Sequence, residues 1–536
     1  MGQGEPMTRR ADVSRRSFLA SMFGAGMGAG AGGRLLNLKL APAGVGRSNT
    51  PSGTDVVTVE PRRPAKYTSY VSRPDLTPVG VTIRRSATFS TSGPQSSFIF
   101  CAPKSPLAAN AGALTHRPDR FPAGATPGLM ILDADGELVW FKPLPGGREI
   151  PFNFRVQTYQ GKPTLTWFQG ALQGAHGVGH YVLADDSYRV IAQVESTDYP
   201  CDLHEFILTP EGTALHTAYE QGVVTDDGAP IIVGHAQEVD VATNELLFDW
   251  SSYPTVDPDL AYTHQLGDYF HINSIGLWPG PARNLIISSR NTCAVYLVDR
   301  LTKRVIWRLG GKRSHFAMGL GTPFYFQHDA RALADGSGLS LFDDASRPCP
   351  ETMASGKVIR LDQEARTATL VHRFLHTDHE LHTPSQGNCQ LLPNGDHVVG
   401  WGFLPFFSAY AASDDTIEAP LILDGRFPPG ADSYRTFIFD WVGHPPLSEL
   451  AVAVLPSGAS GKLRAWASWN GATEVATWQV NASSSSSSPR PLARAKRTGF
   501  ETAINFEPGN ATIFEVVALD ASGQVLGRSD PVPLTL

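Results

Sequence analysis

The segment Met130–Trp140 reads MILDADGELVW, and its pattern decides the fold class. Two apolar runs flank a turn rich in Asp and Gly, which is the signature of a β-hairpin. The same arrangement recurs at residues 239–250, which read VDVATNELLFDW, and at residues 296–307, which read YLVDRLTKRVIW. We therefore expect an all-β protein built from a repeated hairpin unit.

Weaker copies of this hairpin begin at Tyr181 and at Lys357. Hairpins of this kind are preceded by another hairpin, so that four strands make one repeat. The preceding hairpins lie at residues 152–168, 204–218, 271–289, 328–342 and 388–401. Four consecutive antiparallel strands are one blade of a β-propeller. Six units begin near Ser97, Phe152, Leu203, Phe270, Phe326 and Gly387, about 58 residues apart. This spacing is longer than the roughly 40–50 residues of compact propeller repeats, so we expect long loops. The sequence predicts a six-bladed propeller over residues 97–444.

The flanking regions have other expected roles. Residues 14–19 read SRRSFL, a twin-arginine export motif, and an Ala-Pro-Ala cleavage site ends at Ala43. We expect a signal peptide over residues 1–43, use of the bacterial twin-arginine export machinery, and a periplasmic, cell-envelope or secreted location. Residues 44–96 are expected to form a linker and a short N-terminal β segment, and residues 445–536 a small accessory β-sandwich.

Composition excludes several classes of protein. The net charge of −7 provides no basic surface for nucleic acid. Beyond the signal, no stretch approaches the roughly 20 apolar residues of a membrane span. The five cysteines include no CxxC pair, which excludes a zinc ribbon or a thioredoxin-type site.

Three histidines and an asparagine recur at one position of the repeat. His204, His271, His328 and Asn388 lie in the first strands of consecutive units, at spacings of 67, 57 and 60 residues. Equivalent positions of a propeller are related by rotation about the central axis, so these side chains should converge at the channel. Nothing structural requires histidine at one repeat position, and we therefore interpret the set as a functional site.

Strand alternation and hairpin geometry extend this site. Asn273 should share a side of its strand with His271, whereas Glu205 and Asp329 should point away from the neighbouring histidines. Arg290 ends the second strand of its unit, and the hairpin should return it to the same end. The site is thus expected to be rich in donors and poor in carboxylates. Imidazoles, an amide and a guanidinium suit an oxyanion such as a sulfuryl group in transfer.

Several motifs resemble those of the arylsulfate sulfotransferase family, in its divergent actinobacterial and fungal branch. The resemblance covers roughly residues 97–444 and is carried by FHINSI at 270–275, LIISSRN at 285–291, QHDA at 327–330 and VGWG at 399–402. It implies a ping-pong transfer from an aryl sulfate to a phenol without a nucleotide donor or other cofactor. By the resemblance, His328 is transiently sulfated, while His204, His271, Asn273 and Arg290 bind the sulfuryl group and handle protons.

Other assignments remain open at this stage. Asn388 and Trp401 are further candidates for substrate contact, with Trp401 stacking on an aryl ring or packing inside a blade. The three histidines are also a possible metal site of a hydrolase or lyase. A non-catalytic propeller that binds a ligand is the third alternative.

Overall fold

The computed structural model describes residues 65–534, apart from residues 87–88, 90–96, 111–112, 145–148, 197, 347–352, 377–379, 412–415, 459–460 and 485–487. The expected signal peptide therefore lies outside the described residues. Within them the chain forms β-sheets that are antiparallel except where residues 317–318 pair in parallel with residues 367–368, together with short 3-10 helices and no α-helix. The all-β class predicted from the hairpin pattern is confirmed.

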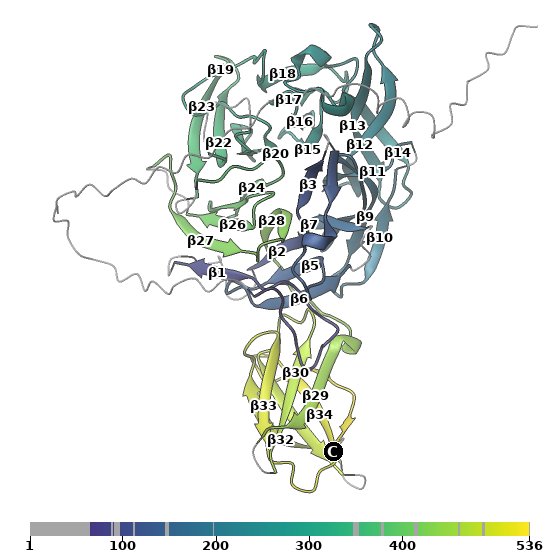
Figure 1. The fold of residues 1–536 in the computed structure, drawn as a ribbon, viewed down its shortest axis with the longest axis vertical. Coiled ribbons are helices and arrows are strands. Elements are labelled where there is room, and N and C mark those ends of the chain that lie inside the picture. The colour runs from purple at the N-terminus through teal and green to yellow at the C-terminus, as the bar shows by residue number, and fades with distance from the viewer. Residues whose placement is uncertain are drawn as a thin grey trace, which may run out of the picture. The chain divides into compact units, whose positions relative to one another are not determined.

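Six groups of four strands account for residues 97–440 (Figure 1). The first group contains β28 (Asp432–Asp440), β2 (Ser97–Lys104), β5 (Gly128–Leu132) and β6 (Leu138–Pro143). The second and third form one continuous sheet with β7 (Ile150–Tyr159), β8 (Lys162–Gln173), β9 (His176–Ala184) and β10 (Val190–Val194), then β11 (Cys201–Leu208), β12 (Thr213–Val224), β13 (Pro230–Asp240) and β14 (Leu246–Ser251).

The remaining three groups follow in chain order. The fourth contains β15 (Ile272–Leu277), β16 (Leu285–Ser289), β17 (Ala294–Val298) and β18 (Val305–Gly310). The fifth contains β20 (His328–Ala332), β21 (Gly338–Asp343), β22 (Ser355–Asp362) and β23 (Thr367–Phe374), with β19 (Ala317–Met318) added at its edge. The sixth contains β24 (Asn388–Leu391), β25 (His397–Gly400), β26 (Phe406–Tyr410) and β27 (Leu421–Arg426), with β1 (Thr82–Arg85) on β27.

Short elements complete this part of the chain. A separate hairpin is formed by β3 (Leu107–Asn110) and β4 (Ala113–His116). The 3-10 helices are η1 (Pro118–Arg120), η2 (Pro258–Leu260), η3 (Gln265–Gly267) and η4 (Leu447–Glu449). Among the described residues, no helix is long and apolar enough to cross a membrane.

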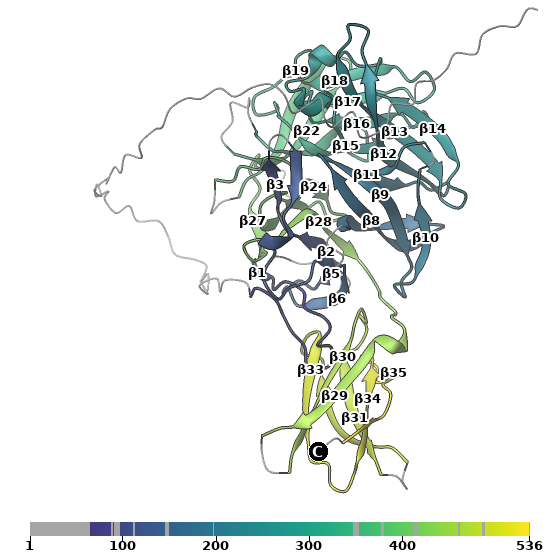
Figure 2. The same cartoon turned by 45° about the vertical axis from the view of Figure 1, so that its right-hand side comes forward.

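Six inner strands contact one another in a cycle. Strand β7 contacts β11, and the contacts continue through β15, β20, β24 and β28 back to β7. The hydrophobic core is divided in the same cyclic way, because each cluster of buried residues packs between two successive groups. Figure 1 labels these six strands, and Figure 2 shows β11, β15, β24 and β28 from a second direction. The six groups of strands thus surround one centre, where their inner strands meet.

The first group differs from the expected order. The sequence pattern predicted four consecutive strands beginning near Ser97, but the inner strand of this group is β28, from residues 432–440. Strand β28 pairs antiparallel with β2, from Ser97↔Asp440 to Lys104↔Asp432. Two segments more than 300 residues apart in sequence therefore share one sheet, which joins the end of the repeat to its beginning.

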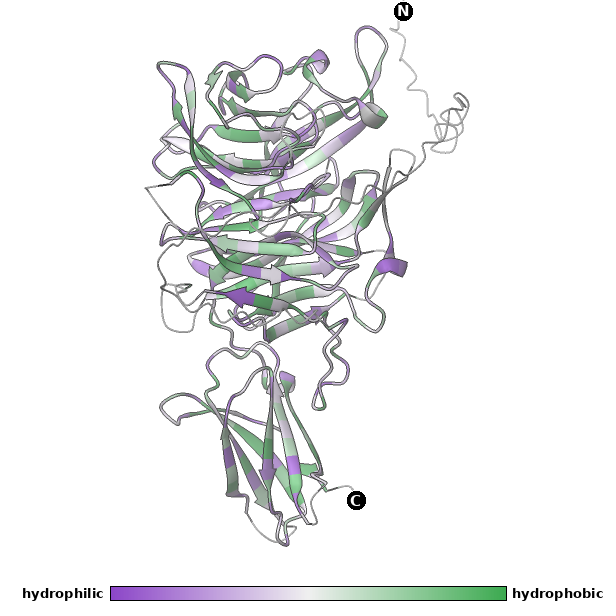
Figure 3. Cartoon of the chain, turned by 60° about the vertical axis from the view of Figure 1, so that its left-hand side comes forward, coloured by the Kyte–Doolittle hydropathy of each residue, from purple (hydrophilic) through white to green (hydrophobic). Residues whose placement is uncertain are grey.

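The C-terminal residues form two further sheets. One contains β29 (Leu450–Pro456), β30 (Leu463–Trp469) and β33 (Glu501–Phe506). The other contains β31 (Thr477–Ser483), β32 (Arg490–Lys496), β34 (Ile513–Leu519), β35 (Val525–Arg528) and β36 (Val532–Pro533). Apolar residues from both sheets share one buried cluster, and apolar and polar residues mix along their strands in Figure 3.

Candidate active site

The inner strands are irregular where the predicted site residues lie. Pairing shifts register between Cys201 and Phe206, between Ile272 and Ser274, and between His328 and Arg331. His271 has a left-handed backbone with φ of 54°. Such bulges redirect side chains and break strict alternation. The prediction that Asn273 shares a side with His271 relied on alternation, and this bulge removes its basis.

Each predicted histidine is paired with an aspartate. The Nδ1–H groups donate to carboxylate oxygens in three pairs: His204 to Asp202 at 2.5 Å, His271 to Asp268 at 2.5 Å, and His328 to Asp344 at 2.7 Å. All six side chains are buried. A site poor in carboxylates was therefore a wrong expectation, because each aspartate comes from outside the repeat position that was compared.

His328 is held in a defined tautomer. Its Nδ1 lies 2.7 Å from Asp344 and 3.1 Å from the carbonyl of Phe326, while its Nε2 accepts the Gln386 backbone N–H at 3.2 Å. Because a backbone N–H always donates, Nε2 carries a lone pair and Nδ1 carries the proton. Burial and the charge of Arg290 lower the pKa of His328 well below its usual range, and burial raises the pKa of Asp344.

His204 and His271 pack together with a third histidine that the repeat comparison did not select. The ring centroids of His204 and His271 are 4.7 Å apart, and the ring of His176 lies 5.3 Å from that of His271. The Nε2 atom of His176 also lies 2.9 Å from Oδ2 of Asp268. His204 and His271 both lower the pKa of His328 electrostatically. The three predicted histidines therefore lie in one neighbourhood.

Asp268 differentiates the two imidazoles that it binds. Burial lowers the pKa of His271 to about 4, although the charge of Asp268 opposes this change. Burial also acts to lower the pKa of His176, but the charge and hydrogen bond of Asp268 outweigh it and raise that pKa. His271 is consequently neutral near pH 7, with its proton on Nδ1 and a lone pair on Nε2.

Arg290 lies beside His328, as the hairpin return predicts. Its backbone N–H donates to the carbonyl of His271 at 2.9 Å, and its guanidinium lies 4.6 Å from the ring centroid of Phe326. The Nη2 group donates to the carbonyl of Pro384 at 2.8 Å. The buried Nε of Arg290 has no hydrogen-bond partner in the described part of the chain. One donor of this cation is therefore available to an anion.

Gln386 adds an unpaired amide to the same neighbourhood. Its side chain is 3% exposed, and neither Oε1 nor Nε2 has a hydrogen-bond partner among the described residues. Its backbone has a φ of 74°, in the left-handed region. An amide buried without partners is costly. The backbone N–H of the same residue donates to Nε2 of His328, so a group bound beside His328 is a candidate to complete the hydrogen bonds of this amide.

The other predicted residues have different surroundings. Asn273 donates from Nδ2 to the carbonyl of Gln327 at 2.6 Å, next to His328, and its buried Oδ1 is unpaired within the described chain. Asn388 exchanges two hydrogen bonds of 2.9 Å with the backbone of Thr436, which ties β24 to β28. These bonds give Asn388 a structural role, in contrast to the substrate contact predicted for it.

Trp401 lies in the hydrophobic core of the sixth group. It is fully buried, its indole N–H donates to Ser408 Oγ at 3.0 Å, and its ring packs 5.7 Å from Phe342. We therefore replace the predicted substrate contact of Trp401 with its alternative role, packing between sheets.

A buried ion network lies among the inner strands. Glu205 binds Arg155 at 2.7 Å, and it also pairs with Arg331 and Arg435. Asp329 joins the network through Arg331 at 2.5 Å. Glu205 and Asp329 are thus engaged by arginines and not by the histidines, in agreement with the predicted orientation. Burial would raise the pKa of Glu205, but the three arginines lower it to about 2.

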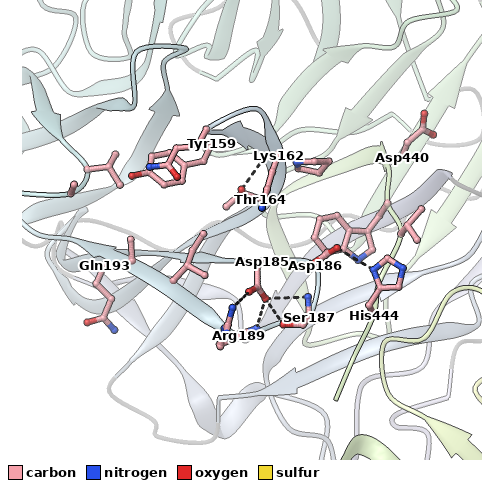
Figure 4. A pocket seen from close by; sticks show the side chains of 18 of the residues that line it. Tyr159, Lys162, Thr164, Asp185, Asp186, Ser187, Arg189, Gln193, Asp440 and His444 are labelled. Carbon is pink, nitrogen blue, oxygen red and sulfur yellow. Dashed lines mark hydrogen bonds and ion pairs between the residues drawn. The ribbon is translucent and has the colours of Figure 1, made fainter. Parts of the chain in front are cut away.

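A groove of about 1170 Å³ lies elsewhere, as Figure 4 shows. Its lining includes Tyr159, Lys162 and Asp186, and His444 lies 3.1 Å from the carboxylate of Asp186. It contains none of the predicted site residues. The histidine neighbourhood remains our candidate site, because it brings together paired imidazoles and unpaired buried donors, and the predicted site residues do not line the groove.

The alternative metal site also changes. Instead of His204, His271 and His328, the set whose possible ligand atoms lie within 4.8 Å of one another is His176, Asp268 and His271. His328 is committed to Asp344 and to Gln386. The three predicted histidines therefore do not form the metal site that a hydrolase or lyase would need.

One protein-family model matches the part of the chain that contains the candidate site. The chain matches the family model described as "Arylsulfotransferase (ASST)" over residues 155–417, which includes all three histidines and Arg290. No curated protein sequence matches the chain. Solved structures match only distantly. A protein of unknown function from Bacteroides caccae is 12% identical with a TM-score of 0.37, and 64% of this chain and 99% of that chain are covered.

A virginiamycin B lyase from Staphylococcus aureus is 9% identical with a TM-score of 0.27, and 73% of this chain and 97% of that chain are covered.

Proposed function

Because this chain belongs to the arylsulfotransferase family, we propose that it moves a sulfuryl group from an aryl sulfate to a phenol through a covalent intermediate on His328. The family supports a sulfotransferase that acts on small aromatic donors and acceptors. The observation that carries the finer proposal is the tautomer of His328, whose Nε2 carries the ring lone pair while Asp344 holds Nδ1–H. This lone pair accepts the Gln386 backbone N–H, so attack requires that N–H to turn from Nε2 to the sulfuryl group.

In the first half-reaction, Nε2 of His328 attacks the sulfur of the bound ester. The N–S bond forms as the bond between sulfur and the aryl oxygen breaks, and the electron pair leaves with the phenolate. The sulfated ring becomes cationic, with its proton still on Nδ1. The carboxyl group of Asp344, 2.7 Å from Nδ1, stabilises this charge. His204 is the candidate to protonate the leaving phenolate.

The sulfuryl oxygens need donors placed around His328. Arg290 has an unpaired Nε–H group, and Gln386 has unpaired amide N–H groups on its Nε2. Together with the Gln386 backbone N–H, these donors suit the charge that develops on equatorial oxygens during transfer. Asn273 positions this region, because its amide holds the carbonyl of Gln327, the residue before His328.

The second half-reaction requires a base. His271 is neutral near pH 7, and Asp268 holds its Nδ1–H, so that Nε2 can accept the proton of an acceptor phenol. The phenolate then attacks sulfur, the N–S bond breaks, and His328 regains its lone pair. The proton gained by His271 passes to His204, whose ring centroid lies 4.7 Å away, and this transfer restores the starting state. Aryl sulfate and phenol thus bind in succession, as ping-pong transfer requires.

The fold and location belong to the same proposal. The cyclic contacts of the inner strands support a six-bladed propeller over residues 97–444, closed by the pairing of β28 with β2. The two C-terminal sheets with their shared core support an accessory sandwich over residues 445–536. We propose that residues 1–43 direct export by the twin-arginine machinery, with residues 44–96 as the linker and N-terminal β segment.

Kinetics with the His328→Asn variant test this function. Wild-type protein should give parallel double-reciprocal plots at several phenol concentrations, and the variant should fold but transfer nothing. Intersecting plots would indicate direct transfer without a covalent intermediate. Substantial transfer by the folded variant would remove His328 from the mechanism.

A further inference from the structure

We propose that His176, Asp268 and His271 form a binding site for a zinc-class divalent cation, whose occupancy restrains sulfuryl transfer. His176 begins β9, Asp268 follows η3, and His271 immediately precedes β15. The three side chains therefore come from two different groups of strands. Their possible ligand atoms lie within 4.8 Å of one another, and all three residues are buried.

The ligand set suits zinc. Two imidazole nitrogens and one carboxylate oxygen, with a fourth position open, make a common zinc environment. The Asp268 oxygen lies 2.9 Å from Nε2 of His176 and 2.5 Å from Nδ1 of His271. Ligand atoms around a tetrahedral zinc ion are separated by about 3.3 Å, given bond lengths of about 2.0–2.2 Å. Small side-chain shifts bring the three atoms to that spacing.

A second observation points to a missing partner. The other oxygen of Asp268, Oδ1, is buried and has no hydrogen-bond partner in the described chain, although Asp268 is only 5% exposed. An unpaired carboxylate oxygen in such a place is costly. A cation beside the carboxylate would compensate for this lost solvation.

The surrounding charge permits a dication. Asp202 accepts the backbone N–H of Gly177, the residue after His176, at 2.6 Å, so two carboxylates lie near the site. Arg290 is a cation that interacts with Asp268 and opposes metal binding. Arg290 and the protonated form of His204 balance these two carboxylates, so the imidazole ligands, and not the net charge, favour zinc over magnesium.

The effect on transfer depends on the proposed function. A metal ion on Nδ1 of His271 replaces the proton that this nitrogen now shares with Asp268. The ring proton then resides on Nε2, so His271 can donate a hydrogen bond but cannot accept the proton of a phenol. Bound zinc should therefore slow the second half-reaction and leave the sulfation of His328 in place.

Calorimetric titration of the metal-free full chain with Zn²⁺ tests the site without any sulfate ester. We expect one ion per chain in the wild type, at least tenfold weaker binding in His176→Gln, and unchanged binding in His235→Gln. His235 is a matched control, because it is a buried histidine bound to Asp249 at 2.9 Å, outside this cluster. Zinc should also raise the Tm of the wild type and of the control variant, but not that of His176→Gln.

The possible results separate the two proposals. Absence of stoichiometric zinc binding, equal affinity in folded His176→Gln, or equal preference for Mg²⁺ would overturn the metal site, whatever the protein catalyses. Acceptor turnover that saturating zinc leaves unchanged would overturn the restraint on transfer. If the zinc-free protein forms no sulfated intermediate, the proposed function is contradicted, while the zinc-binding measurement remains valid.

Discussion

The substitution Asp344→Asn tests whether the hydrogen bond at Nδ1 makes His328 a nucleophile. Asp344 is fully buried and lies 2.7 Å from Nδ1. Burial raises the pKa of Asp344, but a cationic imidazole at 2.7 Å favours the ionised carboxylate. Asparagine keeps the size of the side chain but cannot ionise, so it cannot stabilise the sulfated ring in this way. The variant should therefore fold normally and form the intermediate slowly.

The expected loss follows from the contacts. Hydrogen bonds to charged groups contribute about 1.5–3 kcal/mol, against about 1 kcal/mol for neutral ones. A loss of about 1–2 kcal/mol in the transition state corresponds to about a 5-fold to 30-fold slower reaction. The loss should remain well below the roughly 10⁴-fold seen when a triad aspartate is changed to asparagine, because the Phe326 carbonyl at 3.1 Å still holds the Nδ1–H tautomer.

A pre-steady-state assay measures this step directly. An aryl sulfate with a coloured leaving phenolate is mixed with each protein, and the rate of the initial burst is recorded. Asp249→Asn is the matched control, because it weakens the His235–Asp249 pair at 2.9 Å outside the site. A burst rate in folded Asp344→Asn within twofold of the wild type would refute this role of Asp344.

Three further predictions concern binding and stability. Arg290→Lys should raise the KM for the donor because a planar fork becomes a point charge, and unchanged donor kinetics would contradict the placement of Arg290. Asn388→Ala should lower the free energy of unfolding by about 1–3 kcal/mol, through loss of two buried hydrogen bonds to Thr436, and leave the donor KM unchanged; a raised KM with unchanged stability would restore its substrate role. The pKa of Glu205 is about 2 in the folded chain and about 4.3 in the unfolded chain, so its ionisation should add about 3 kcal/mol to the free energy of unfolding above pH 4.3, which is lost as the pH falls through 2. In urea unfolding, the free energy of unfolding should therefore change with pH between about 4.3 and about 2, and it should change less in Glu205→Gln; equal slopes would contradict this.

The repeat pattern in the sequence predicts much of the fold. Apolar alternation and Asp-Gly turns are local signals, and they locate the inner strands near Leu203, Phe270, Phe326 and Gly387. The pairing of β28 with β2 has no local signal, because it joins the two ends of the repeat. Long-range closure of this kind is decided by packing between sheets.

The candidate site was predictable where the repeat register carries it. Comparison of register identifies His204, His271 and His328, and the hairpin identifies Arg290. Asp202 and Asp268 were within reach of sequence reasoning, because they precede His204 and His271 by two and three residues.

Other parts of the site carry no such signal. Asp344, His176 and Gln386 come from different strands and loops, so only the folded chain brings them to the histidines. Asn388 illustrates the opposite error: its register position matches theirs, but its amide serves the neighbouring backbone.

The most direct test of the central claim is the intact mass of the protein after mixing with an aryl sulfate and no acceptor, quenched at alkaline pH. The account predicts a mass increase equal to one SO₃ group, located on His328 by peptide mapping and removed by added phenol. An unmodified wild-type protein during active turnover, or an adduct on a residue other than His328, would contradict it.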